Sequence, residues 1–296
     1  MCRDGSALVV ITPAGTTRQN QLLWLFGVED QPELQFMFQQ IEGDNDAELD
    51  FTARYILDEL RPELEEPEAD RLDDLIEPFG LTFPSTRVFS DLARASLPHI
   101  CCLDDPDAAL VDWMDREEQM FRRLERRIVA ERIQNGFHTD DGADVDGFLS
   151  FSLSVQNRRK SRVGSALENN LEEIFTQHRI TFARGAETEN RNRPDFLFPG
   201  QEYRDESFPS HKLAMLDAKS TVKDRWRQVL SEARRIEDKH LLTLELGISE
   251  NQTDEMRAKR LQLVVPRKIQ ATYRPRQLAW LMDVSSFLAL LKQRAT

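Results

Sequence analysis

Residues 193–200 read RPDFLFPG, and residues 213–219 read LAMLDAK. Each is a short apolar run with an acidic residue near one end, which is the pattern of a buried strand that meets a polar edge. In the second run, Asp217 and Lys219 stand two residues apart, so both side chains point to the same face of a strand. In the first run a proline directly precedes Asp195, as is typical of a strand entrance, because proline has no backbone N–H. The two runs therefore predict strands that carry a group of acids and a lysine.

Around these runs, the spacing of apolar residues predicts an α/β fold with a mixed sheet flanked by helices. Ser85 or Thr86 is predicted to cap a helix, and Gly136 to end another. We expect strands near 148–155, 180–184, 195–199, 212–219, 240–245 and 261–265, and two short buried strands, or a strand and a turn, at 7–12 and 21–27. We expect helices near 47–62, 63–78, 87–96, 108–135, 163–178, 222–238, 251–260 and 283–293.

The acids and the lysine suit metal-dependent hydrolysis of a phosphate ester. Carboxylates can hold a divalent cation, and a lysine beside them can stabilise phosphate charge or orient a water. Two further acids fall close by in the predicted layout: Glu168 on the helix before the sheet and Glu232 on the helix after it. Such an oxygen-rich, partly hydrated cluster favours Mg²⁺. Each of these residues alone is common in proteins, and Glu232 alone is most simply a surface acid. Their order and spacing together favour a metal-dependent active site over an ordinary surface.

The bulk composition fits one large or two modest globular domains. The chain has 296 residues, of which 40% are hydrophobic and 31% charged. It has no apolar run of about 18 residues, so we expect no membrane span and no export signal. Three cysteines, of which two are adjacent, give no disulfide framework, and we expect a reducing, cytoplasmic setting.

The net charge of −13 is concentrated in one segment. Residues 42–77 contain 15 acids and 3 arginines, so the rest of the chain is close to neutral. The acidic segment is most simply a solvated helical surface or a linker. The net charge therefore does not exclude a nucleic-acid partner for the remaining chain.

From about residue 83 to 280 the chain resembles the catalytic domain of EcoRII-type restriction endonucleases, in the PD-(D/E)xK nuclease superfamily. The matching text is RGAETENRNRPDFLFPG (184–200), DAKSTVKDRWRQVLSEARRI (217–236), SFSLSVQNRRKSRVGSALENNLEEIF (150–175), HLLTLELGIS (240–249) and LQLVVP (261–266). A chance Asp-x-Lys would not carry the Lys-Asp-Arg-Trp-Arg-Gln segment with it.

The resemblance implies roles for the acid–lysine group. Asp195 would bind the metal and Lys219 would be the catalytic lysine. In this branch the second metal-binding acid stands on the following helix, where Glu232 lies, whereas the general superfamily form would use Asp217. We favour Glu232 and keep Asp217 as the alternative. Glu168 matches the helix acid before the sheet, and Tyr203 matches a tyrosine of the family near the site, with its role open.

The resemblance also implies DNA-contacting residues. Lys223, Asp224 and Arg225 would read outer C:G pairs, since Arg and Lys donate to guanine O6 and N7 while Asp accepts from cytosine N4. Trp226 is more simply a core residue than a base-stacking one. Phosphate contacts, which position without specifying, are expected from Arg158, Arg159, Lys160 and Arg162.

The expected protein is thus a Mg²⁺-dependent type II restriction endonuclease that acts on double-stranded DNA at a CCWGG-like site as a homodimer. The expected domains are residues 1–82, a remnant of an effector-type domain with an acidic helical linker, and residues 83–296, the catalytic domain. Two alternatives remain: a repair or nicking nuclease of the same superfamily, and a catalytically silent DNA-binding protein.

Overall fold

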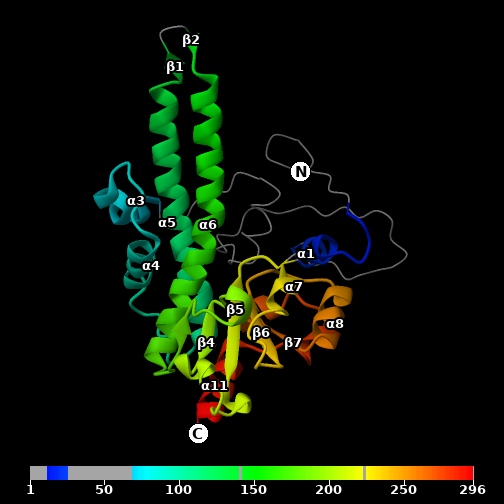
Figure 1. Cartoon of the computed structure of the whole chain (residues 1–296). Coiled ribbons are helices and arrows are strands. Elements are labelled where there is room, and N and C mark those ends of the chain that lie inside the picture. The colour runs from blue at the N-terminus through cyan, green and yellow to red at the C-terminus, as the bar shows by residue number, and fades with distance from the viewer. Residues whose placement is uncertain (1–11, 26–68, 140–141, 223–224, 296) are drawn as a thin grey trace.

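A five-stranded mixed sheet lies at the centre of a computed structural model that describes residues 12–25, 69–139, 142–222 and 225–295 (Figure 1). The strand order is β3-β4-β5-β6-β7. The strands are β3 (Ala183–Arg184), β4 (Phe196–Phe198), β5 (Ala214–Lys219), β6 (Lys239–Thr243) and β7 (Leu261–Val264). The predicted mixed α/β sheet is confirmed.

The direction of the strands changes at β5. Strands β3, β4 and β5 pair antiparallel, whereas β5, β6 and β7 pair parallel. In register, Phe196 of β4 lies opposite Leu216 of β5. This pairing brings Asp195, the residue before β4, next to the end of β5, where Asp217 and Lys219 lie.

Two long helices, α5 (Pro106–Gln134) and α6 (Val145–Gln177), run side by side and project beyond the sheet as an arm (Figure 1). The tip of the arm is closed by the short strands β1 (His138–Thr139) and β2 (Gly142–Ala143). Asp105 caps α5 by accepting from the backbone N–H groups of Asp107 and Ala108, at 3.1 and 3.0 Å. Gly136, at φ +70°, follows its last turn as predicted.

The strand predicted at 148–155 is wrong, because these residues form the first turns of α6. The Asp144 carboxylate caps this helix by accepting from the backbone N–H of Gly147 at 2.8 Å. Phe148 and Phe151 pack on Phe137, with ring centroids 5.3 and 5.7 Å apart. Alternation of serine and apolar residues suggested a strand, but the apolar side chains here stand on an exposed arm tip, where Leu149 and Leu153 are 52% and 63% exposed. The helix predicted at 163–178 is therefore the second half of a longer one.

The remaining elements surround the sheet and the base of the arm. The α-helices are α1 (Thr17–Leu25), α3 (Ala69–Ile76), α4 (Thr86–Ala95), α7 (Trp226–Val229), α8 (Glu250–Ala258), α9 (Arg267–Gln270), α10 (Pro275–Leu278) and α11 (Val284–Ala295), and the 3₁₀ turns are η1 (Glu77–Phe79), η2 (Glu189–Arg191), η3 (Gln201–Arg204) and η4 (Ser210–Lys212). Ser85 caps α4 as predicted, by accepting from Val88 N. The main core lies between the sheet and the helices, and a smaller cluster joins α3, α4 and α5.

Two further helix and strand predictions need correction. The helix expected over 222–238 is confined to α7, because the chain turns through Ala233 at φ +45°, which a helix cannot contain. The strand or turn expected over 21–27 is wrong up to Leu25, since α1 occupies that stretch. Asn20 and Gln21 of α1 donate to the carbonyls of Gly247 and Leu246, at 3.3 and 2.9 Å, and so dock the helix on the main body.

The predictions for residues 7–11, 26–27, 47–62 and 63–68 lie outside the described residues, while α3 confirms part of the helix expected at 63–78. In the part of the chain that the structure describes, no helix is both long enough and apolar enough to cross a membrane.

Candidate active site

Asp195 and Lys219 form an ion pair where β4 begins and β5 ends. The Lys219 Nζ donates to Asp195 Oδ2 at 2.9 Å, and the backbone N–H of Ala218 donates to the same oxygen at 2.8 Å. Both side chains are partly open to solvent, at 17% and 26% exposed. The pair thus has a fixed geometry and remains accessible to a ligand.

Asp217 lies on the same face of β5 as Lys219, but it is buried at 2% exposed. Its Oδ1 accepts from the backbone N–H of Asp195 at 3.0 Å, while its Oδ2 lies 4.0 Å from Lys219 Nζ. Burial and the charge of Asp195 raise the pKa of Asp217 to about 6. Asp217 Oδ1 is therefore engaged in a hydrogen bond that fixes the backbone at the start of β4.

Glu232 joins this group from the turn after α7, and not from a helix as predicted. It lies against Asp217, close enough for a hydrogen bond between the two carboxyl groups. Burial, followed by the charge of Asp217, raises the pKa of Glu232 to about 7. Its Oε2 is buried and has no hydrogen-bond partner. A buried carboxylate oxygen without a partner is costly unless a cation or a proton compensates it.

The residues fit a bound Mg²⁺ ion. Among the described residues, no three His, Cys, Asp or Glu side chains close into a ready-made metal cage. Mg²⁺ does not need one, because it keeps several waters and uses one or two carboxylates together with substrate phosphates. Asp195 and Glu232 supply such a pair, and the unpartnered Glu232 oxygen is the atom that a cation would satisfy.

This arrangement predicts that a divalent cation stabilises the fold more at high pH than at low pH. The pKa values of Asp217 and Glu232 are raised in the folded state, so folding binds protons, and the stability that these protons supply is lost as pH rises through about 6 to 7. A cation should replace them above that window. With Ca²⁺ at 100 times its Kd, we expect the melting temperature to rise by about 5 °C at pH 8.

Differential scanning fluorimetry with and without Ca²⁺ at pH 5.5 and pH 8 measures this effect. At pH 5.5 the shift should be much smaller. Equal shifts at the two pH values would show that the cation binds elsewhere.

Glu168 and Tyr203 lie around the cluster without touching it in the described contacts. Glu168 Oε2 pairs with Arg184 of β3 at 2.7 Å. The Tyr203 hydroxyl donates to Glu189, at 2.6 to 2.7 Å, and accepts from the backbone N–H of Arg235 at 3.4 Å. Glu168 therefore braces the strand next to β4, and Tyr203 contacts the turn that carries Glu232.

The segment expected to read bases is only partly visible. Lys223 and Asp224 lie outside the described residues. Arg225 is exposed, and its Nη2 donates to the carbonyl and hydroxyl oxygens of Thr221, at 3.0 and 2.8 Å. Trp226 is buried at 1% exposed, which confirms it as a core residue.

The basic residues of α6 divide into exposed and buried ones. Arg158, Arg159 and Lys160 are exposed, although Arg158 stacks over Phe83 at 4.3 Å and Arg159 Nε donates to Glu125 of α5 at 2.6 Å. The structure does not support the phosphate contact predicted for Arg162, because this side chain is only 6% exposed and is engaged by Glu117 and Glu118 of α5. Arg162 ties the two helices of the arm together.

Glu245 is a residue beside the segment expected to read bases, and the sequence does not single it out. Its carboxylate accepts a hydrogen bond from the backbone N–H of Val222, directly before the segment expected to read bases. The Tyr273 hydroxyl donates to its carbonyl at 2.7 Å. The only signal was an acid within the apolar run LTLELGIS, just past the end of a buried strand.

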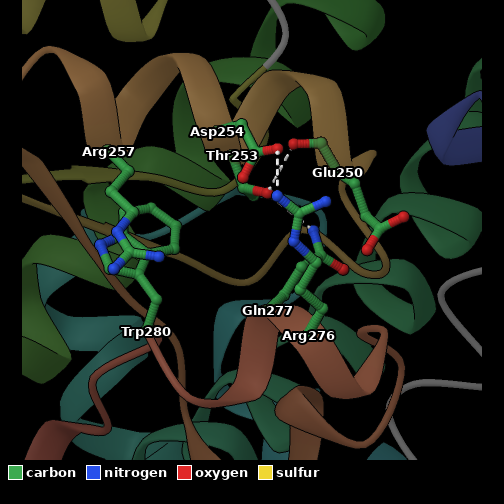
Figure 2. Close-up of a pocket in the computed structure, with 7 residues that line it drawn as sticks. All are labelled: Glu250, Thr253, Asp254, Arg257, Arg276, Gln277 and Trp280. Atoms are coloured by element: carbon green, nitrogen blue, oxygen red, sulfur yellow. Dashed lines mark hydrogen bonds and ion pairs between the residues drawn. The ribbon is translucent and has the colours of Figure 1, made fainter.

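A pocket elsewhere on the surface is separate from this cluster (Figure 2). It lies between α8 and the α10 region, where Gln277 donates to Thr253 Oγ1 at 2.9 Å and Arg276 pairs with Asp254 at 3.3 Å. Two pairs of its polar side chains thus bind each other. The lining residues are Glu250, Thr253, Asp254, Arg257, Arg276, Gln277 and Trp280, and none belongs to the acid–lysine cluster.

A mixed sheet that carries an acid after a proline, with a lysine at the end of the next strand, defines the fold of the PD-(D/E)xK restriction endonucleases. Comparison of structures agrees with this fold. Metal-depleted Ecl18kI in complex with uncleaved DNA superposes with a TM-score of 0.56 at 16% identity, covering 77% of this chain and 84% of that one. The restriction endonuclease PspGI, in a complex with substrate DNA, gives 0.56 at 13% identity, covering 72% and 93%.

The chain belongs to the EcoRII C-terminal family, whose model matches residues 121–288. The type II restriction enzyme EcoRII of Escherichia coli is 40% identical over 220 residues, which cover 73% of this chain and 52% of that enzyme. The chain thus spans about half the length of this curated relative. The family predicted from the sequence runs is confirmed.

Proposed function

We propose that this chain is a Mg²⁺-dependent endonuclease that hydrolyses phosphodiester bonds of double-stranded DNA at a specific sequence. The observation that carries the proposal is the joined cluster of Asp195, Lys219 and Glu232, with an accessible ion pair of 2.9 Å beside a buried, unpartnered carboxylate oxygen. These are the groups that metal-assisted phosphate hydrolysis requires.

Each residue of the cluster has a defined task in this proposal. Asp195 and Glu232 would hold the cation, which lowers the pKa of an attacking water and offsets charge that develops on the phosphate. Lys219 would donate to a phosphate oxygen or orient the water. Burial alone would lower the pKa of Lys219, but the charges of Asp217 and Asp195 raise it above its ordinary value, so the side chain stays cationic.

The resemblance to the family supports a proposal for DNA specificity and for assembly. The segment 223–225 would read C:G pairs of a CCWGG-like site from the major groove, at about 1–3 kcal/mol for each good bidentate contact. The exposed Arg158, Arg159 and Lys160 would position the DNA through its phosphates. The described residues form one acid–lysine cluster, so a homodimer would cut both strands of a two-fold symmetric site.

A digest of a defined plasmid by the purified protein in Mg²⁺ tests the proposal. We expect discrete double-strand fragments, and sequencing of their ends should give one constant CCWGG-like context. Relaxed circles without linear fragments would favour the repair or nicking alternative. A gel shift without cleavage in Mg²⁺ would favour a silent DNA-binding protein.

A further inference from the structure

The turn that carries Glu232 has an unusual backbone. Helix α7 ends at Val229, and the chain then passes through Ala233 at φ +45°. This left-handed region is sparsely populated by residues with a Cβ, at a cost on the order of 1–3 kcal/mol. Such a conformation persists only where the surroundings over-determine it, so the contacts of this turn are informative.

From the outer side, polar side chains of the segment before β4 and of η3 bind the backbone of the turn. Asn192 Nδ2 donates to the carbonyl of Ser231 at 3.0 Å. Glu189 Oε2 accepts from the backbone N–H of Arg234 at 3.3 Å, and the Tyr203 hydroxyl, itself bound to Glu189, accepts from the next N–H. These contacts fix the peptide groups on either side of the left-handed residue.

From the inner side, one buried lysine binds the same turn. Lys239, the first residue of β6, is only 7% exposed, and its Nζ donates to the carbonyls of Ala233 and Ile236 at 3.3 and 2.6 Å. No described residue lies within ion-pair distance of it; burial lowers its pKa, and the charges of Glu189 and Glu232 offset only part of that effect. A buried ammonium that makes no close ion pair is costly, and a methionine would fill the same space at lower cost if packing alone mattered.

We infer that Lys239 and Glu189 are positioning residues, which clamp the turn from its two sides and thereby hold the Glu232 carboxylate against the Asp195–Lys219 pair. This inference rests on the proposed function, because it assigns the clamp to the metal-binding task of Glu232. Residues that orient a metal ligand typically contribute a factor of about 10–100 to metal affinity.

Lys239→Met tests the inner side of the clamp, and Lys259→Met, at an exposed lysine, is the matched control. Calorimetric titration with Ca²⁺, well below the melting temperature of each variant, should give about 10–100-fold weaker binding for Lys239→Met and an unchanged affinity for the control. The Mg²⁺ concentration for half-maximal cleavage should rise by a similar factor, with recovery at high Mg²⁺. A purely structural lysine would lower the melting temperature and leave the Ca²⁺ affinity of the folded protein unchanged, and that result would overturn the inference.

Glu189→Ala tests the outer side with less risk to folding, since this side chain is only partly buried. Weakened Ca²⁺ binding in this variant supports the clamp even if Lys239→Met does not fold, and unchanged binding overturns it. Failure of the proposed function would look different, because the unmodified protein itself would then neither bind Ca²⁺ at this site nor cut DNA.

Discussion

Replacement of Asp195 by asparagine is expected to reduce DNA cleavage in Mg²⁺ by at least about 10³-fold while leaving specific DNA binding intact. Bound metal contributes several kcal/mol to stabilisation of charge in the reaction, and each 1.4 kcal/mol corresponds to about tenfold in rate. Asparagine keeps an oxygen that can accept from Ala218 N, so the strand entrance should survive. The loss should therefore lie in the chemistry and not in the fold.

Single-turnover cleavage and a gel shift in Ca²⁺ separate these two effects. The Asp195→Asn variant should shift the same DNA fragment at a protein concentration close to that of the unmodified protein. Lys259→Met, far from the cluster in sequence and exposed, should cut normally. Normal cutting by Asp195→Asn would remove this residue from the site.

The part of the site that lies on strands could be predicted from the sequence, because strand geometry is local. Asp217 and Lys219 share a face by their spacing of two, and the proline before Asp195 marks the start of β4. Pairing of β4 with β5 then brings the three residues together. Placing these three residues together requires only the order of the strands and no other contact with distant parts of the chain.

The part of the site that lies on the turn could not be predicted in the same way. Helical spacing over 222–238 was apparent, but the chain leaves the helix at Val229, and the left-handed Ala233 is held by residues about 30 to 45 positions earlier. Likewise Arg162 is one of four basic residues within the five positions 158–162, yet its partners Glu117 and Glu118 lie on another helix. Where a helix ends and whether a side chain is buried depend here on contacts between segments distant in the sequence. A local sequence pattern carries no information about those contacts.

The contrast between Glu232→Gln and Asp217→Asn decides which acid is the second metal ligand. We expect Glu232→Gln to lose about 10²–10³-fold in cleavage, because a neutral amide replaces the carboxylate whose Oε2 is left without a partner. Asp217→Asn should retain most of the activity, because asparagine can still accept from the backbone N–H of Asp195.

The pH dependence of metal binding is a second way to decide between Glu232 and Asp217 as the metal ligand. Burial and the charge of Asp217 raise the pKa of Glu232, so removal of that charge in Asp217→Asn should lower the pKa of Glu232 and allow Ca²⁺ to bind at lower pH than in the unmodified protein. Calorimetric titration between pH 5 and pH 8 measures this shift. An inactive Asp217→Asn beside an active Glu232→Gln would instead establish Asp195, Asp217 and Lys219 as the metal-binding and catalytic set, with Glu232 as their neighbour.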